Sequence, residues 1–151
     1  MRTATSSIFT LITTLIFCCV SCVFAPGSYP YAELYEFQVS EDSLIRIVEK
    51  FKDKNPKYSL HEQERFVDGR KSEGKQWYHV WFYYPQENQV IKCWIRTSDK
   101  GYAEFGFVGI GNGLTLSDYK EINKDFSKQE NRFQKDKFER LILNEIKKLI
   151  K

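Results

Sequence analysis

The sequence predicts an α+β domain in which a four-stranded antiparallel meander sheet carries an N-terminal and a long C-terminal helix on one face. Three observations predict this architecture: a helical pattern after residue 40, four short alternating segments separated by turn residues, and a second helical pattern after residue 127. Alternating strands bury one face of a sheet, and amphipathic helices cover that face. We assign residues 40–151 to this single domain.

The first helix is expected to begin after Ser40, a favourable N-cap residue. Glu41 and Asp42 follow it, and carboxylates favour the positive end of the helix dipole. The pattern ends before Pro56 because proline cannot continue a helix. Its apolar stripe at helical spacing consists of Leu44, Ile47, Val48 and Phe51. The preceding segment, 31–39, also alternates, and both a strand and an extended arm remain open for it.

Four segments then carry strand patterns bounded by turn residues. These segments are 58–67, 76–84, 89–97 and 102–110. The first is the most polar and is expected at a sheet edge, followed by a loop over 68–75. Short turns at 85–88 and 99–101 join the other three, which favours antiparallel hairpins.

A capping box predicts the start of the C-terminal helix. In this motif the side chains of Ser127 and Glu130 accept hydrogen bonds from backbone N–H groups that have no partner within the helix. We expect the helix to continue to near Lys148. One of its faces carries Phe138, Leu141, Ile142, Ile146 and Leu149.

The turns also predict the pairing of the strands. A four-residue turn places Tyr84 opposite Gln89, and a three-residue turn that ends at Gly101 places Ile95 opposite Phe105. The sheet face expected beneath the helices then consists of Tyr78, Val80, Phe82, Ile91, Cys93, Ile95, Ala103, Phe105 and Phe107.

The opposite sheet face carries all three tryptophans. The register places Trp81 opposite Lys92 and Trp77 opposite Arg96. One interpretation is a binding surface, because tryptophan is enriched at binding hot spots. The other is that cross-strand aromatic–cation pairs only stabilise the sheet, or that the arm over 29–37 folds across them. The candidate binding residues, called the aromatic face below, are Trp77, His79, Trp81, Tyr83, Lys92, Trp94 and Arg96.

Residues 1–21 have the pattern of an export signal peptide, with an apolar run over 8–20 that is shorter than the roughly 20 residues needed to span a bilayer. The sequence Cys-Val-Ser-Cys, which ends at Cys22, resembles the lipobox of bacterial lipoproteins, although leucine is more usual in the place of Cys19. This resemblance implies lipidation of Cys22 and a membrane anchor, with a tether and arm over 22–39. The absence of an acidic cluster over 23–28 favours an anchor that faces the periplasm. The chain as a whole resembles small bacterial envelope lipoproteins. A secreted protein without lipid is the alternative.

The sequence contains no evident catalytic, metal or cofactor motif. His61 and His79 are its two histidines, and Cys93 is the one cysteine outside the signal region, so a zinc site is not expected. The register places Cys93 and His79 on opposite sheet faces, which argues against a nucleophile–base pair. The glycine-rich stretch 109–113 is expected to be a turn rather than a phosphate-binding loop, because it opens no helix. An enzyme would have to use His79 with Glu104.

The charge pattern does not indicate nucleic acid as a partner. The net charge of +3 arises from acidic and basic residues mixed along the chain. We therefore expect an envelope lipoprotein without cofactors, whose domain binds an envelope protein or a small ligand. An inhibitor or immunity-type protein is one version of this, and an envelope hydrolase or a purely structural component is the alternative.

Overall fold

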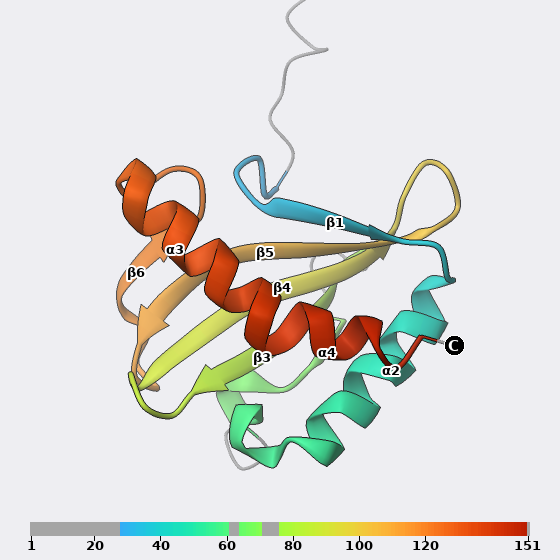
Figure 1. Ribbon diagram of the computed structural model, residues 1–151, viewed down its shortest axis with the longest axis horizontal. Helices are drawn as coiled ribbons and strands as arrows, with labels where there is room; N and C mark the ends of the chain where they lie inside the picture. The colour runs from blue at the N-terminus through green and yellow to red at the C-terminus, as the bar shows by residue number, and fades with distance from the viewer. Residues whose placement is uncertain (1–27, 61–63, 71–75, 151) are drawn as a thin grey trace, which may run out of the picture. The chain divides into compact units, whose positions relative to one another are not determined.

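The computed structural model describes residues 28–60, 64–70 and 76–150. Its strands are β1 (Glu33–Phe37), β2 (Gly69–Arg70), β3 (Tyr78–Tyr84), β4 (Gln89–Thr97), β5 (Ala103–Asn112) and β6 (Ser117–Glu121). All of them except β2 are labelled in Figure 1. Its helices are α2 (Glu41–Lys54), α3 (Lys128–Phe138) and α4 (Asn144–Lys147), with a π-helical turn over Glu139–Leu143 and 3-10 turns over Pro56–Tyr58 and Glu64–Phe66. The expected signal peptide and Cys22 lie outside the described residues.

Within the described ranges, six strands form one antiparallel sheet in the order β1-β5-β4-β3-β2, and β6 also pairs with β5. The α+β class predicted from the sequence is confirmed, but the predicted number of four strands is wrong. The predicted first helix is present as α2, with Ser40 as its N-cap, although β1 precedes it. The domain therefore begins with a strand rather than with a helix.

The edge strand expected over 58–67 is replaced by two 3-10 turns and the two-residue strand β2. Phe66 packs its ring against Trp81 at a centroid distance of 5.1 Å, with an angle of 65° between the ring planes. Side chains also bind the backbone of β3 at Trp81, which is where a longer edge strand would have paired. The segment 58–67 is polar and has only weak alternation, so its sequence did not distinguish a regular edge strand from 3-10 turns whose side chains bind β3.

The segment 31–39, left open by the sequence, contains the strand β1. It pairs with β5 so that Leu34 lies opposite Gly106 and Phe37 lies opposite Ala103. Because β1 extends the sheet sideways beside β5, as Figure 1 shows, this strand does not fold across the aromatic face. Phe37 points to the helix side and belongs to the core.

The register predicted for β3, β4 and the first half of β5 is confirmed. Tyr84 pairs with Gln89, and Ile95 pairs with Phe105. Gly101, at the end of the second turn, has a φ of 80°, in the left-handed region that favours glycine. A bulge next to Cys93 then inserts Val108 as an extra residue of β5.

The glycine-rich stretch is largely strand rather than turn, which corrects the prediction for 109–113. β5 continues to Asn112, and β6 returns beside it. A Cβ atom on Gly109 would lie only 2.6 Å from the hydroxyl oxygen of Tyr119, and one on Gly111 would lie 2.9 Å from the Cα of Leu116. The glycines therefore allow side chains and backbone from the β6 region to approach β5 closely.

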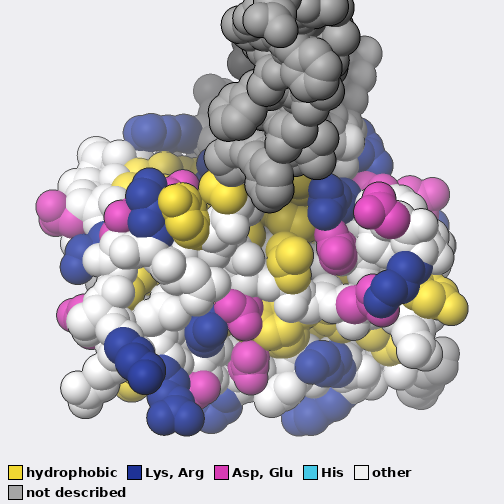
Figure 2. Space-filling view, turned by 90° about the horizontal axis from the view of Figure 1, so that it is seen from above, with side chains coloured by type: hydrophobic (Ala, Val, Ile, Leu, Met, Phe, Trp, Pro, Cys, Tyr) yellow, Lys and Arg dark blue, Asp and Glu magenta, His cyan; other side chains and the backbone are white. Residues whose placement is uncertain are grey.

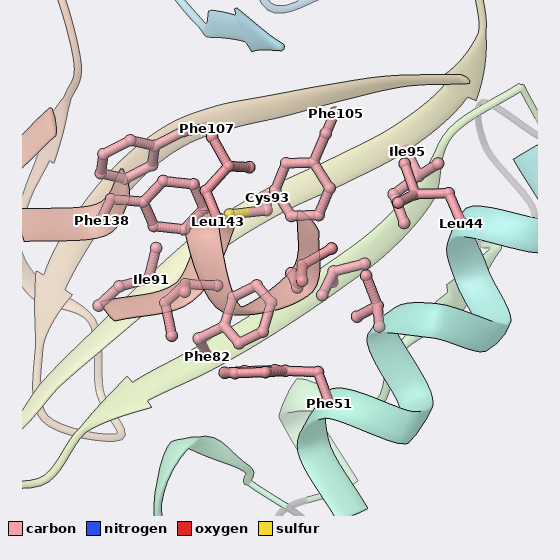
Figure 3. Packing of buried hydrophobic residues seen from close by; sticks show 14 of the residues in the cluster. Leu44, Phe51, Phe82, Ile91, Cys93, Ile95, Phe105, Phe107, Phe138 and Leu143 are labelled. Carbon is pink, nitrogen blue, oxygen red and sulfur yellow. The ribbon is translucent and has the colours of Figure 1, made fainter. Parts of the chain in front are cut away.

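The hydrophobic core lies between the sheet and the helices α2, α3 and α4 (Figure 1; Figure 3). Phe138 of α3 is its central ring, with centroid distances of 4.5 Å to Phe107, 5.9 Å to Phe105 and 6.2 Å to Phe82. The buried face of the sheet includes Val80, Phe82, Ile91, Cys93, Ile95, Ala103, Phe105 and Phe107, which are residues predicted for the core.

The C-terminal helical segment begins with the predicted capping box of Ser127 and Glu130. The π-helical turn that follows α3 is wider than an α-helical turn. In an α-helix with 3.6 residues per turn, residues spaced four apart are rotated progressively to one side of the helix. A π-helical turn holds more residues and rotates the following residues back toward the original face. Phe138, Ile142 and Ile146, spaced four residues apart, are all fully buried as a result.

The surface that Figure 2 shows from above carries acidic and basic side chains interspersed with one another. Glu36 and Glu33 of β1 form ion pairs, with Nζ–Oε2 distances of 2.9 Å for Lys100–Glu36 and 3.1 Å for Lys135–Glu33. Such solvent-screened pairs contribute little to the stability of a fold.

Replacement of Phe138 by alanine is expected to lower the free energy of unfolding by about 3–5 kcal/mol, because it leaves a cavity among three other phenylalanine rings. Phe133→Ala on the same helix is the matched control, since Phe133 is 59% exposed. Its effect should stay within about 0.5 kcal/mol. Urea unfolding followed by circular dichroism measures both, and equal losses for the two variants would contradict this description of the core.

Candidate functional site

The seven residues of the aromatic face lie together on the sheet side opposite α2, α3 and α4. His79 pairs with Trp94, and Trp81 pairs with Lys92, across β3 and β4. Side chains directly opposite each other in an antiparallel pair point to the same face. Leu34 of β1 lies opposite Gly106 and extends this face, with 51% of its surface exposed.

One half of the aromatic face is a stack built on Trp94. Its ring lies 4.6 Å from that of Trp77 at an angle of 67°, an edge-to-face arrangement. The Arg96 guanidinium carbon lies 4.9 Å from the Trp77 ring centre and 5.3 Å from that of Trp94. Gly106 lies under this stack, because a Cβ atom there would overlap the indole of Trp94.

The guanidinium of Arg96 is also held by a carboxylate. Arg96 Nε donates to Glu104 Oε2 at 2.8 Å, and its Nη2 lies 2.7 Å from the same oxygen. Glu104, which sequence reasoning considered as a partner of His79, is therefore bonded to Arg96 on the neighbouring strand. Strand β4 separates Glu104 from His79: His79 on β3 pairs with Trp94 of β4, and Glu104 on β5 pairs with Arg96 of β4.

The other half of the aromatic face centres on Trp81. Phe66 packs against it, and Val90 and Leu60 belong to the same apolar cluster. Lys92 Nζ lies 6.0 Å from the centre of the Trp81 ring. This cluster forms a second, smaller core on the outer side of the sheet.

Burial divides the seven residues into two groups. Trp94 is 1% exposed, Trp81 5%, His79 5% and Trp77 8%. Tyr83, Lys92 and Arg96 are partly exposed. A partner that approaches this face therefore meets the cations and the tyrosine first, and the indoles act as a rigid layer that supports them.

A polar group that sequence reasoning missed joins this layer to α2. Lys52 is buried, its Nζ forms an ion pair with Asp68, and it donates to the carbonyl oxygen of Trp81 at 2.7 Å. Asp68 Oδ1 accepts from the backbone N–H of Trp81 at 2.9 Å. The spacing of Lys52 could have revealed its burial from the sequence. Lys52 follows Leu44 and Val48 at intervals of four, so its charge lies within the apolar stripe of the helix.

A cavity of about 290 Å³ lies beside this ion pair, between α2 and the segment that leads to β2. Its lining includes Glu49, Asp53, Asp68 and Tyr78. Burial, together with the negative charges of Asp68 and Glu49, raises the pKa of Tyr78 to about 12. The phenol keeps its proton well above the pH at which an ordinary tyrosine ionises, so it remains a hydrogen-bond donor, as in its contact with Glu49.

Cys93 lies on the core side of the sheet, as the predicted register requires. Cys93 is fully buried in the main core, and burial raises the pKa of its thiol well above the usual value. Among the described residues, no group of three or more His, Cys, Asp or Glu side chains is arranged to hold a metal ion. In those same residues, no helix is long and apolar enough to cross a membrane.

Comparison of the chain with protein-family models, with curated proteins and with solved structures finds no match. The function proposed below therefore depends on the residues and their geometry alone.

Loss of one member of the Lys52–Asp68 pair is expected to destabilise the fold strongly. Lys52→Met leaves a largely buried carboxylate without its cation, and should cost about 3 kcal/mol of unfolding free energy. Arg70→Met is the matched control, because the Arg70–Glu41 pair also joins α2 to this segment, but the Arg70 side chain is 40% exposed against 7% for Lys52, and Glu41 keeps a hydrogen bond from Thr97 Oγ1 at 2.8 Å. It should cost less than about 1 kcal/mol. Urea unfolding measures the loss of unfolding free energy in both variants. Equal losses would contradict the expectation that the buried Lys52–Asp68 pair matters more for stability than the Arg70–Glu41 pair.

The tyrosine pKa values predict loss of stability at alkaline pH. Tyrosine in the unfolded chain ionises near its ordinary pKa of 10.0, whereas Tyr78 in the fold keeps its proton up to about pH 12, and the pKa values of Tyr35 and Tyr84 are also raised, mainly by burial. Above pH 10 the folded state thus binds more protons than the unfolded state, so the unfolding free energy falls as pH rises. Tyr78→Phe should make this decline shallower. Urea unfolding across roughly pH 9 to 11 measures it, and a flat profile would contradict the raised values.

Proposed function

We propose that this protein is a bacterial envelope lipoprotein, lipidated at Cys22, whose domain is a non-enzymatic binding module. Its partner is an envelope protein that contacts the aromatic face. The anchor rests on the lipobox-like motif that follows the apolar run of the expected signal peptide. The binding role rests on how the aromatic face is built.

The observation that carries the binding role is the position of Arg96. Its guanidinium lies against two indoles and one carboxylate, yet 37% of the side chain remains exposed. Arginine and aromatic residues are enriched in the energetically important centres of protein interfaces. A guanidinium held in place by stacking loses little conformational freedom when a partner binds it.

A protein partner suits this surface better than a small ligand does. The exposed groups are spread over a sheet face, from Leu34 on β1 to Arg96 and Lys92 on β4 and Tyr83 on β3. An exposed arginine, tyrosine and apolar side chain on one sheet face match protein interfaces, in which arginine and aromatic residues are enriched. The partner is expected to offer carboxylates to the two cations and an apolar group to Leu34.

The lipid anchor would hold the domain at a membrane surface. A single acyl chain binds a bilayer only marginally, so stable anchoring needs the several chains that a bacterial lipoprotein carries. The residues between Cys22 and the first strand would serve as a tether between the lipid and the domain.

Cys22→Ser tests the anchor. When the full chain is produced in bacteria, the unchanged protein should partition into the membrane fraction and into the detergent phase, with a mass increased by covalent lipid. The variant should lose both properties. Cys18→Ser is the control, because Cys18 lies within the apolar run. Equal partitioning of the two variants, or an unmodified mass of the unchanged protein, would refute lipidation at Cys22.

Site-directed photo-crosslinking tests the binding face. p-Benzoylphenylalanine in place of Tyr83, a partly exposed aromatic residue on this face, should give a discrete adduct with an envelope protein in intact bacteria. The same group in place of Phe133, an exposed residue of α3, is the control and should give none. Arg96→Ala should weaken the adduct. Adducts from position 133 alone, or equally from both positions, would refute the proposed face.

A further inference from the structure

The C-terminal helical segment has an outer side that faces away from the sheet. In Figure 1, α3, the π-helical turn and α4 lie as one continuous rod across the sheet. An exposed row of residues, spaced four apart, runs along this rod on the side opposite the core. The row consists of Arg132, Asp136, Arg140, Asn144 and Lys148. The π-helical turn keeps the row aligned in the same way that it keeps the core residues of the segment on the sheet side.

Four cations on this outer side form no ion pair with a described carboxylate. They are Lys128, Arg132, Arg140 and Lys147, and all four are exposed. Lysine and arginine bind phosphate groups through charge-assisted hydrogen bonds. A row of such cations along an exposed helix therefore fits a surface that presents many phosphates.

Most carboxylates near this side already have partners. The engaged carboxylates and their partners are Glu145 with Lys148, Glu33 with Lys135, and Glu139 with the Tyr35 hydroxyl, at 2.6, 3.1 and 3.2 Å. Glu130 accepts from the backbone N–H of Ser127 and lines a cavity toward β6. Among the described residues of the outer side, Asp136 is the one exposed carboxylate without a partner, against four unpaired cations.

An apolar ring lies among these charges. Phe133 is 59% exposed, follows Arg132 directly and precedes Arg140 by two helical turns. Helices that lie on a bilayer surface combine cations with aromatic or apolar side chains, which enter the boundary between headgroups and acyl chains. A single exposed ring is common on protein surfaces. The combination of this ring with unpaired cations is what favours a membrane surface over water.

The start of the domain lies beside the first half of this helix. Asn123 Nδ2 donates to the carbonyl oxygen of Tyr31 at 3.1 Å, and Asn131 Nδ2 of α3 donates to Asn123 Oδ1 at 2.7 Å. Tyr31 follows Cys22 by nine residues. Nine residues span roughly 30 Å at full extension. A lipid on Cys22 would therefore hold the first half of α3 within about that distance of the bilayer.

We propose that the outer side of the C-terminal helical segment docks on the anionic phospholipid headgroups of the membrane; the docking rests on the lipid anchor proposed above. Its cations bind headgroup phosphates, and the Phe133 ring enters the interface. Each cation contributes little alone, and the tether supplies the high local concentration that a weak contact needs. The aromatic face, on the opposite side of the sheet, then points away from the membrane, toward a partner in the envelope.

Photo-crosslinking to lipid tests the docking, with p-benzoylphenylalanine in place of Phe133. The full-length protein is purified from bacterial membranes and reconstituted into vesicles of phosphatidylcholine alone, or of equal parts phosphatidylcholine and phosphatidylglycerol. Mass spectrometry should find several times more phospholipid adduct in the anionic vesicles. About 1 M sodium chloride should remove this difference, because the Debye length falls to about 3 Å. The same group in place of Tyr83, on the aromatic face, should give little lipid adduct in either vesicle.

A pair of matched charge variants locates the contact. Arg140→Gln, combined with the photoreactive group at position 133, should lower the adduct yield in anionic vesicles about fivefold, the effect of one basic residue near such a surface. Arg65→Gln is the control. Arg65 is exposed and lies 5.7 Å from the ring centre of Phe66, on the opposite side of the sheet. It removes the same charge and should leave the yield unchanged.

Equal adduct yields from the two kinds of vesicle would overturn the docking. Equal yields from Arg140→Gln and Arg65→Gln, or as much lipid adduct at position 83 as at position 133, would overturn it too. Flotation of the vesicles before irradiation separates this failure from a failure of the anchor. A protein that floats with both kinds of vesicle is anchored, so equal yields then refute the docking alone. A protein that does not float with neutral vesicles lacks the anchor, which refutes both the anchor and the docking that rests on it.

Discussion

A buried lysine joins the two sides of the sheet in this domain. Lys52 extends from the helix-covered side, forms an ion pair with Asp68 and binds the carbonyl oxygen of Trp81 at the edge of the sheet. Asp68 binds the N–H group of the same residue. Two side chains thus satisfy the backbone of β3 where β2 no longer pairs with it, and they protect an edge that would otherwise be open to another strand. Removal of either partner from a buried ion pair strongly destabilises a fold. The residues around Lys52 and Asp68 are therefore held in the arrangement that keeps this pair intact.

The outer side of the sheet depends on that contact. Phe66 lies two residues before Asp68 and packs on Trp81, so the ion pair also places the side chain that covers half of the aromatic face. The other half depends on Gly106, the one residue type that leaves room for Trp94. Both faces of the central strands are therefore densely packed, and the cations of the outer face project from a rigid base.

The sequence predicted the parts of the fold that depend on local rules. Helix caps, turn lengths and alternation were sufficient for α2, the C-terminal helical segment and the pairing of β3 with β4. It did not predict β6, whose sequence is short and polar and which becomes a strand because the glycines of β5 admit it. For the candidate site, alternation placed all seven residues on one face. Their burial could not be predicted, because it depends on contacts such as that of Phe66, which is distant in sequence from Trp81.

Tryptophan fluorescence tests most directly whether the Lys52–Asp68 pair keeps the indoles beneath the aromatic face buried. The unchanged protein should emit at short wavelength and resist quenching by acrylamide. Asp68→Asn should shift the emission to longer wavelength and increase the quenching while the far-ultraviolet circular dichroism stays the same; Glu41→Gln, which alters the more exposed pair with Arg70, should do neither. Emission from the unchanged protein like that of indole in water, or an Asp68→Asn variant as protected as the unchanged protein, would contradict the account.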